Sequence, residues 1–142
     1  MSMVKIEEDE KRLLEVALKA MKCAYVLWGF RVGAAVLAKD GQIYEGCNVE
    51  SWVSGLGTCA ERCAINHAVL HGNRRIKEVA IVMEAHKQSQ PLPCGACLQH
   101  IYDFAVNHRI KIIMAKAERS KILFETMKVK TLDQLFPFPY KK

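Results

Sequence analysis

Thr58-Cys-Ala-Glu-Arg-Cys-Ala-Ile-Asn66 and Pro93-Cys-Gly-Ala-Cys97 are the two stretches around which this chain is organised. Cys94 and Cys97 form a Cys-x-x-Cys pair, and Cys59 supplies a third thiolate. Three protein ligands leave one position of a tetrahedral zinc ion open, and catalytic zinc sites activate water at that position. No fourth Cys or His lies at a standard ligand spacing near either stretch. The sequence therefore predicts an open site for one Zn²⁺, held by Cys59, Cys94 and Cys97.

Both stretches lie where helices are predicted to begin. One helix is predicted from Thr58 to about His71, because Gly72-Asn73 is a typical C-terminal stop. The other is predicted from Cys94 to about His108, with a proline directly ahead of its first turn. Helix N-termini carry a partial positive charge, which stabilises thiolates. We therefore expect two helix N-termini to converge on the metal.

Arg62 is the predicted electrostatic partner of the metal site. Three thiolates outweigh the charge of one Zn²⁺, which would make the metal a poor Lewis acid. Arg62 follows Cys59 by three residues, so the two side chains lie on the same helical face. We expect the guanidinium to donate to sulfur and offset the excess negative charge.

Two interpretations of Glu61 compete. Thr58-x-x-Glu61 is a capping-box pattern, in which the carboxylate would only bond the backbone N–H of Thr58. A carboxylate beside a three-ligand zinc ion can instead shuttle protons between water and substrate. The neighbouring Cys59 and the later Cys-x-x-Cys pair favour Glu61 as a catalytic residue.

The other cysteines and histidines are weaker candidates for metal binding. Cys63 follows Cys59 by four residues and is a possible ligand, but a buried small apolar role is favoured. Cys23 and Cys47 are expected at core or strand positions. His67 and His71 lie four apart on a predicted helix, a spacing that can bind metal, although nothing else in the sequence supports a site there.

The hydrophobic pattern predicts an α/β protein with the element order α-β-β-α-β-α-β-β-α. A five-stranded sheet covered by helices on both faces is the natural layered solution. The Asp40-Gly41 dipeptide predicts a hairpin between the first two strands. The remaining predicted elements are a helix from Glu7 to about Tyr25, strands Phe30–Ala38, Gln42–Val49, Ile76–Ala85, Ile110–Ala117 and Ile122–Val129, and a short helix opened by a Thr131-x-x-Gln134 capping box.

Length and composition predict one ordered domain spanning residues 1–142. Of the 142 residues, 51% are hydrophobic, and no apolar run approaches the roughly 20 residues of a membrane span. The N-terminal residues are charged and do not resemble a signal peptide, so a reducing, cytoplasmic location is expected. The net charge is +6, but the basic residues are scattered without interleaved aromatic residues. Nucleic-acid binding is therefore not favoured.

Four motifs occur in order along the chain: Phe30-x-Val-Gly-Ala-Ala35, Gly46-Cys-Asn-Val-Glu50, Cys59-Ala-Glu-Arg62 and Pro93-Cys-Gly-Ala-Cys97. Together they resemble the motifs of the small zinc-dependent cytidine deaminases. The resemblance is strong between Phe30 and Gln99 and weak towards both ends. It implies a three-layer α-β-α fold with a five-stranded mixed sheet, and the hydrolysis of cytidine or deoxycytidine to the uridine and ammonia in pyrimidine salvage.

The resemblance also implies roles for individual residues. Phe30 would lie beside the pyrimidine, Asn48 and Glu50 would bind the ribose 3′-hydroxyl, and Glu61 with the backbone of Ala60 would hold the base edge. Small members of this family are homotetramers in which neighbouring subunits complete each site, often with a C-terminal aromatic residue. The residues available for that role here are Phe136, Phe138 and Tyr140. The alternative is that Asn48 and Glu50 are ordinary polar residues at a hairpin end and Phe30 a core strand residue.

Several positions around the expected pocket depart from the family pattern. The segment Tyr25-Val-Leu-Trp-Gly29 replaces a Tyr-Ser-Pro-Tyr-like run, and Leu92, Leu98 and Ser54 stand where Ser, Arg and Tyr are usual. These changes leave the metal ligands intact but put the substrate in question. Blasticidin S, a cytosine-bearing antibiotic, is the alternative substrate. A nucleic-acid-editing deaminase and a non-enzymatic binding module stapled by zinc are less favoured.

Overall fold

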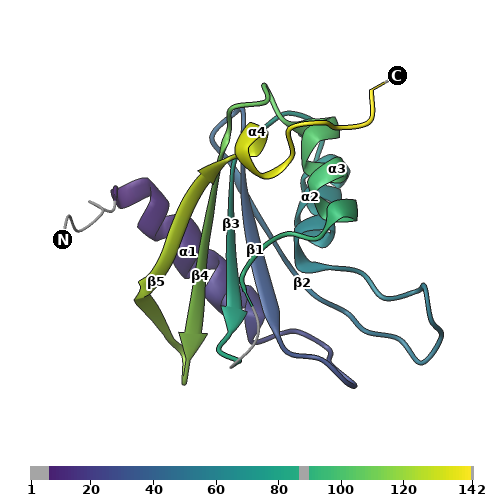
Figure 1. Cartoon of the computed structure of the whole chain (residues 1–142), viewed down its shortest axis with the longest axis vertical. Coiled ribbons are helices and arrows are strands. Elements are labelled where there is room, and N and C mark those ends of the chain that lie inside the picture. Colours follow the sequence, from purple (N-terminus) through teal and green to yellow (C-terminus); the bar gives the residue numbers. More distant parts are fainter. Residues whose placement is uncertain (1–6, 87–89, 142) are drawn as a thin grey trace.

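The computed structural model describes residues 7–86 and 90–141, and the elements within them follow the predicted order (Figure 1). The helices are α1 (Glu8–Met21), α2 (Ala60–Leu70), α3 (Gly95–Phe104) and α4 (Leu132–Leu135). The strands are β1 (Val32–Ala38), β2 (Ile43–Cys47), β3 (Ile76–Glu84), β4 (Lys111–Glu118) and β5 (Lys121–Thr131). None of the helices in these residues is long and apolar enough to cross a membrane.

The strands form one five-stranded mixed sheet in the order β2-β1-β3-β4-β5. The β3–β4 pair is parallel and the other pairs are antiparallel. The predicted hairpin at Asp40-Gly41 joins β1 to β2, with Leu37 opposite Ile43. Gly41 has a φ of +92°, a conformation that glycine adopts without steric cost. The mixed sheet and the hairpin are as expected.

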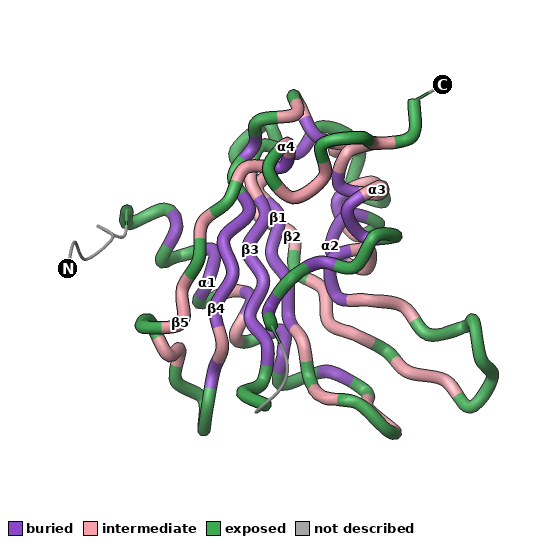
Figure 2. The backbone as a smooth tube through the Cα atoms, viewed as in Figure 1, coloured by how far each residue is buried: buried purple, intermediate pink, exposed green. Residues whose placement is uncertain are grey.

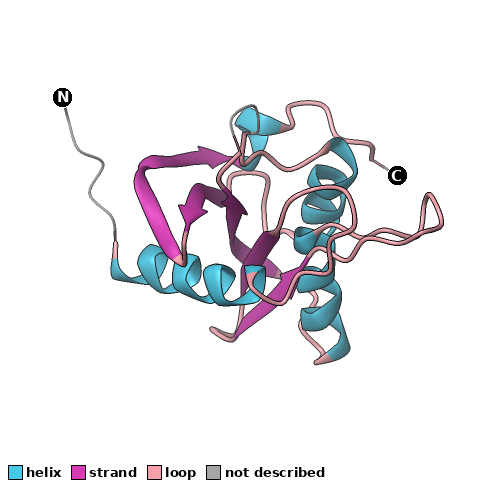
Figure 3. Cartoon of the chain, turned by 90° about the horizontal axis from the view of Figure 1, so that it is seen from below, coloured by secondary structure: helices cyan, strands magenta, loops and turns pink. Residues whose placement is uncertain are grey.

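Helices cover both faces of the sheet, which confirms the three-layer arrangement (Figures 1 and 3). Leu13, Leu14 and Ala17 of α1 pack on one face, where Ala35 of β1 also points. The other face carries α2 and α3, with Ile65 among the buried residues of that core. Successive side chains of a strand point to opposite faces of the sheet. The apolar residues of β1 and residues 79–83 of β3 are therefore buried on both faces (Figure 2).

Two glycines allow helices to lie directly on strand backbones. A Cβ atom at Gly33 of β1 would lie 1.9 Å from the carbonyl oxygen of Ala17 in α1. A Cβ atom at Gly46 of β2 would lie 2.3 Å from the backbone nitrogen of Ala64 in α2. These close approaches set the depth at which α1 and α2 sit on the sheet, and with it the position of the N-terminus of α2.

Several predicted boundaries differ from the structure by two or more residues, and at three of them tertiary contacts override the local pattern. Helix α1 ends at Met21, not near Tyr25, since the N–H of Tyr25 donates to the carbonyl of Asn48 at 3.1 Å. Helix α3 ends at Phe104, not near His108, because Ala105 is extended and bridges to β3. Strand β1 begins at Val32 and not at Phe30, because the Asn48 side chain hydrogen-bonds to the backbone of both residues. The capping box of α4 is confirmed.

Candidate active site

The three predicted metal ligands meet at the N-termini of α2 and α3. Cys59 is the N-cap residue of α2, Cys94 is the N-cap residue of α3, and Cys97 lies in the first turn of α3. Their Sγ atoms all lie within 4.8 Å of one another. No other cluster of three His, Cys, Asp or Glu ligand atoms at this separation occurs among residues 7–86 and 90–141.

The geometry and the electrostatics of this sulfur cluster fit a zinc ion. Two sulfur ligands of a tetrahedral zinc, each about 2.3 Å from the metal, lie about 3.8 Å apart. A hydrogen bond from the Cys97 thiol, supported by Arg62, lowers the pKa of Cys59 to about 5. The same bond and burial raise the pKa of Cys97. The cluster therefore already favours one thiolate, the form that binds metal.

Arg62 lies where the sequence predicts it. Its Nη2 atom donates to the Sγ atom of Cys59 at 3.5 Å. Its Nε atom is buried and has no hydrogen-bond partner among the described residues. The guanidinium thus adds positive charge directly against the sulfur cluster.

The remaining cysteines stand apart from this cluster. Cys47 lies in β2 and is half-buried, as expected for a strand position. Cys63 is half-buried in α2 and is not a member of the sulfur cluster. The expectation for Cys23 is wrong, because this residue is exposed in the turn that follows α1. The helix ends earlier than predicted, which leaves Cys23 off its buried face.

Glu61 is a buried carboxylate at the wall of a cavity. Its exposed fraction is 4%, and burial raises its pKa. The capping-box interpretation is wrong, since the N-cap residue is Cys59 and not Thr58, and the Cys59 side chain makes no capping hydrogen bond. The N–H of Thr58 donates instead to the carbonyl of Val49 at 2.9 Å. The carboxylate is therefore not bonded to Thr58. It lies at the cavity wall, where its own backbone N–H and the Cys97 thiol donate hydrogen bonds to it.

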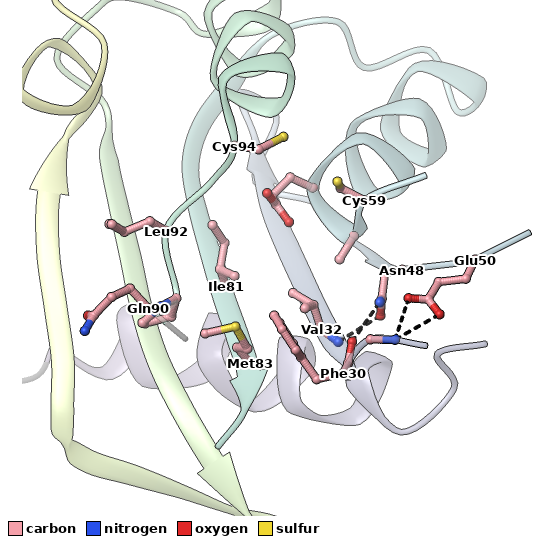
Figure 4. A pocket seen from close by; sticks show the side chains of 14 residues that line it. Phe30, Val32, Asn48, Glu50, Cys59, Ile81, Met83, Gln90, Leu92 and Cys94 are labelled. Carbon is pink, nitrogen blue, oxygen red and sulfur yellow. Dashed lines mark hydrogen bonds between the residues drawn. The ribbon is translucent and has the colours of Figure 1, made fainter. Parts of the chain in front are cut away.

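The cavity has a volume of about 340 Å³ and opens beside the sulfur cluster (Figure 4). Phe30, Asn48, Glu50 and Ala60, the four predicted substrate-binding residues, all line it. The sequence did not predict the contribution of β1 and β3 or of the loop that precedes α3. Those additional lining residues are Gly29, Val32, Ile81, Met83, Gln90, Pro91 and Leu92. Leu92 and Gly29 had a signal in the sequence as departures from the family pattern, and Val32 lies within the first of the four motifs.

Asn48 is hydrogen-bonded to the backbone that leads into β1. Its Oδ1 atom accepts from the N–H of Val32 at 2.8 Å, and its Nδ2 atom donates to the carbonyl of Phe30 at 2.9 Å. The side chain occupies the place of a ladder partner, so regular pairing of β1 starts only at Val32. Asn48 is therefore more than an ordinary polar residue at a hairpin end.

Glu50 holds the adjacent turn. Its carboxylate accepts hydrogen bonds from the backbone N–H groups of Leu27, Trp28 and Gly29, the last at 3.1 Å to Oε2. These bonds, led by that of Trp28, lower the pKa of Glu50. A Cβ atom at residue 29 would lie 2.6 Å from Oε2, so any larger residue there would have to displace the Glu50 carboxylate. Glu50 and Asn48 together fix segment 27–32, which forms one rim of the cavity.

Phe30 lies in this rim and not in the core. It precedes β1, is half-buried, and stacks on His86 with ring centroids 5.9 Å apart and an interplanar angle of 24°. The interpretation of Phe30 as a core strand residue is therefore wrong. No pattern in the sequence indicated His86, because residues 30 and 86 meet only through the pairing of β1 with β3.

Three thiol ligands and a buried carboxylate, carried by two helix N-termini beside a mixed sheet, define the class of zinc-dependent nucleobase deaminases. Residues 7–114 match the family model of the cytidine and deoxycytidylate deaminase zinc-binding region. The chain is 44% identical to a cytidine deaminase from Sporosarcina psychrophila over 97 residues, which covers 68% of this chain and 70% of that protein. This chain therefore belongs to the cytidine deaminase family.

Two solved structures share the fold of this chain, and a further relative is similar along nearly its whole sequence. A crystal structure of cytidine deaminase from Burkholderia pseudomallei superposes with a TM-score of 0.78 at 31% identity, covering 92% of this chain and 98% of that one. The cytidine deaminase from Mycobacterium tuberculosis superposes with a TM-score of 0.73 at 28% identity, over 96% and 100% of the two chains. A blasticidin-S deaminase from Bacillus cereus is 27% identical over 141 residues, or 95% of this chain and 94% of that protein.

Proposed function

We propose that this protein catalyses the zinc-dependent hydrolytic deamination of cytidine and deoxycytidine, releasing uridine or deoxyuridine and ammonia. The observation that carries the proposal is the buried Glu61 in a cavity of about 340 Å³ beside the sulfur cluster. That volume is near the lower end of small-molecule sites, which suits a nucleoside. The six free cysteines suit a reducing compartment, and the proposed role places the enzyme in the cytoplasm.

Cys59, Cys94 and Cys97 would hold the zinc ion, which when bound supplies Lewis-acid activation of water. Glu61 accepts a proton as water adds to C4 of the pyrimidine and delivers it to N3. It then transfers the second water proton to the departing amine, so that the C4–N bond breaks as the C4 carbonyl forms. Burial favours the protonated carboxyl, which keeps the proton inside the cavity between the two transfers. Arg62 offsets the thiolate charge.

The remaining lining residues orient the substrate. Phe30 lies against the pyrimidine, and the backbone of Ala60 holds the base edge beside Glu61. The ribose 3′-hydroxyl binds between Asn48 and Glu50. Oε2 of Glu50 accepts one N–H bond in the structure, and a carboxylate oxygen has room for a second donor. A hydroxyl can donate there, whereas a phosphodiester is repelled by charge, so polynucleotides are disfavoured.

The first test replaces Glu61. Glu61→Gln keeps the shape of the side chain but removes its proton-transfer capacity, and the loss of general acid–base catalysis predicts a fall in kcat of about 10²- to 10⁴-fold. The measurement is the loss of absorbance as cytidine becomes uridine, with zinc content checked by elemental analysis. Glu10→Gln is the matched control, because Glu10 is equally buried, at 4%, but pairs with Lys111 on α1's side of the sheet.

Full activity in the zinc-loaded Glu61→Gln variant would contradict the mechanism. If the wild-type protein turns over none of the substrates tested, yet binds one zinc per chain, a non-enzymatic zinc-stapled module is the better description. A fall in activity in the Glu10→Gln variant equal to that in Glu61→Gln would show that the loss reflects general destabilisation.

Blasticidin S is the second candidate substrate. The observations that favour it are the similarity to a blasticidin-S deaminase along nearly the whole chain and the unusual residues at the cavity, such as Leu92. Parallel assays with cytidine, deoxycytidine, blasticidin S and single-stranded oligonucleotides separate the options. We expect kcat/KM to be highest for the free nucleosides. Turnover of blasticidin S alone would identify the protein as a blasticidin S deaminase. Turnover of oligonucleotides alone would indicate a nucleic-acid-editing enzyme.

We further propose that the protein is a homotetramer in which neighbouring subunits complete each site. Exposed apolar side chains gather near residues 25–28 and 49–56, beside the rim of the cavity. The rings of Trp28 and Trp52 contact each other edge to face, with centroids 5.3 Å apart. We call this set the rim patch: Tyr25, Trp28, Val49, Trp52, Val53 and Leu56. A patch of this kind marks an interaction surface. The family resemblance supports a second copy of the chain as its partner.

The C-terminal tail supplies an aromatic residue for such an assembly. Gln99 in α3 holds the backbone of Tyr140 through two hydrogen bonds, of 3.0 and 3.1 Å. This fixes the tail on the outside of α3, where the side chain of Phe138 is 91% exposed. Phe138 is therefore the tail residue best placed to reach a neighbouring subunit.

A further inference from the structure

We propose that His67 and His71 form a second metal site, which takes a borderline divalent transition-metal ion such as Zn²⁺, Ni²⁺ or Cu²⁺. The two residues lie at the C-terminal end of α2, one helical turn apart. The sulfur cluster lies at the opposite end of this 11-residue helix, about 16 Å away at 1.5 Å per residue. The proposed site is thus separate from the candidate active site.

The two imidazole rings are spaced as metal ligands would be. Their centroids lie 4.9 Å apart. Two imidazoles that share one tetrahedral metal, with metal–nitrogen distances of about 2.0–2.1 Å, have centroids roughly 5 Å apart. The centroid distance between the two rings therefore matches that of two imidazoles bound to one ion.

Backbone hydrogen bonds leave the outer ring nitrogens free to bind. The Nδ1 atom of His67 lies 3.0 Å from the carbonyl oxygen of Glu45, and that of His71 lies 3.0 Å from the carbonyl oxygen of His67. A carbonyl oxygen only accepts, so Nδ1 carries the proton in both rings. The neutral imidazoles then present their lone pairs on Nε2. Histidines that bind metals commonly have this arrangement, with the second nitrogen bonded to a carbonyl or carboxylate.

Neighbouring groups hold the pair in place and favour a cation. The ring of Tyr44 contacts both imidazoles, with centroids 5.3 Å from His67 and 5.4 Å from His71. The Tyr44 hydroxyl is hydrogen-bonded to the side-chain amide of Asn73 at 2.6 Å. The C-terminal end of a helix carries a partial negative charge, which attracts a positive ion. His71 is exposed and His67 is half-buried, so the remaining coordination positions are open to water.

The test is metal titration of untagged protein whose cysteine site has first been filled with zinc. Isothermal titration with Ni²⁺, and separately with Zn²⁺, is expected to show one additional ion per chain. His67→Ala and His71→Ala should each weaken this binding at least tenfold, while His86→Ala, which removes an imidazole elsewhere, should leave it unchanged. His71→Phe keeps an aromatic ring against Tyr44, so it separates loss of the ligand from loss of packing.

Two outcomes would overturn the proposal. One is equal binding of the additional ion by the wild type, His67→Ala and His71→Ala. The other is unchanged binding in His71→Phe, because a phenyl ring offers no lone pair. Thermal unfolding measured with and without Ni²⁺ gives an independent readout: the metal should raise Tm in the wild type and in His86→Ala, but not in His71→Phe. None of these measurements depends on deaminase activity.

Discussion

The carboxylate of Glu50 accepts hydrogen bonds from three successive backbone N–H groups and also lines the cavity. One side chain thus has a structural and a proposed substrate-binding role. Glu50→Ala would remove both at once, because it leaves the N–H groups of residues 27–29 without their acceptor. Glu50→Gln separates the roles, since an amide oxygen still accepts from the turn while the charge is lost.

Glu50→Gln is expected to fold, to retain zinc and to raise the KM for cytidine by about 10- to 100-fold, with kcat changed much less. The estimate rests on the loss of a hydrogen bond to a charged group, worth about 1.5–3 kcal/mol. Steady-state kinetics on the zinc-loaded protein measures it. Glu45→Gln, an exposed residue of β2 outside the cavity, is the control. A KM equal to that of the wild type would limit Glu50 to holding the turn.

Among the secondary-structure elements, helix α1 packs directly on the backbone of β1, because Gly33 has no side chain. Gly33→Ala would place a methyl group 1.9 Å from the carbonyl oxygen of Ala17 and 2.4 Å from the backbone nitrogen of Met21. Neither backbone atom can rotate away, so α1 must move off the sheet. Overpacking of this kind costs typically 1–3 kcal/mol.

We expect Gly33→Ala to lower the free energy of unfolding by about 3 kcal/mol, measured by urea denaturation at a fixed zinc concentration. Gly57→Ala is the matched control, because its methyl group would meet its nearest neighbour, the carbonyl oxygen of Val49, at an ordinary 3.6 Å. A Gly33→Ala variant as stable as Gly57→Ala would show that α1 is not seated against β1 as the structure has it.

At the scale of the whole molecule, the rim patch leaves large apolar side chains in water beside the cavity. Trp52 is 75% exposed, and Trp28, which it contacts, is 64% exposed. Burial against another copy would recover roughly 25 cal/mol for each Å² of apolar surface removed from water. Because the rim patch lies beside the cavity, the proposed tetramer contacts would also form part of the wall of the active site.

Trp52→Glu is expected to reduce the mass measured by light scattering after size-exclusion chromatography, from a tetramer to a dimer or monomer. It should also lower kcat/KM, because the site would lose the contribution of its neighbour. Leu70→Glu is the control, since Leu70 is 80% exposed on α2 but lies outside the rim patch. A wild-type protein that is monomeric and fully active at micromolar concentration would contradict the proposal.

Features that depend on local spacing can be predicted from the amino-acid sequence alone. The Cys-x-x-Cys pair and the predicted starts of α2 and α3 indicated where the three metal ligands lie. The three-residue spacing between Cys59 and Arg62 indicated that both side chains lie on the same face of α2. The Asp40-Gly41 turn determined the first hairpin, and the Thr131-x-x-Gln134 pattern determined the capping box of α4. Each of these signals spans only a few residues, so short-range periodicity and turn chemistry are enough to predict it.

The pairing of polar groups that are distant in sequence depends on the packed fold and could not be predicted from local patterns. The competing role of Glu61 was excluded because Thr58 donates to Val49, and the end of α1 was set because Tyr25 pairs with the strand end at Asn48. The contact between Phe30 and His86 joins residues far apart in sequence. A buried backbone N–H group must find an acceptor, but a local pattern does not say which of several acceptors the packed sheet brings near. That choice follows from the register of β1 between β2 and β3, and it shapes the rim of the cavity.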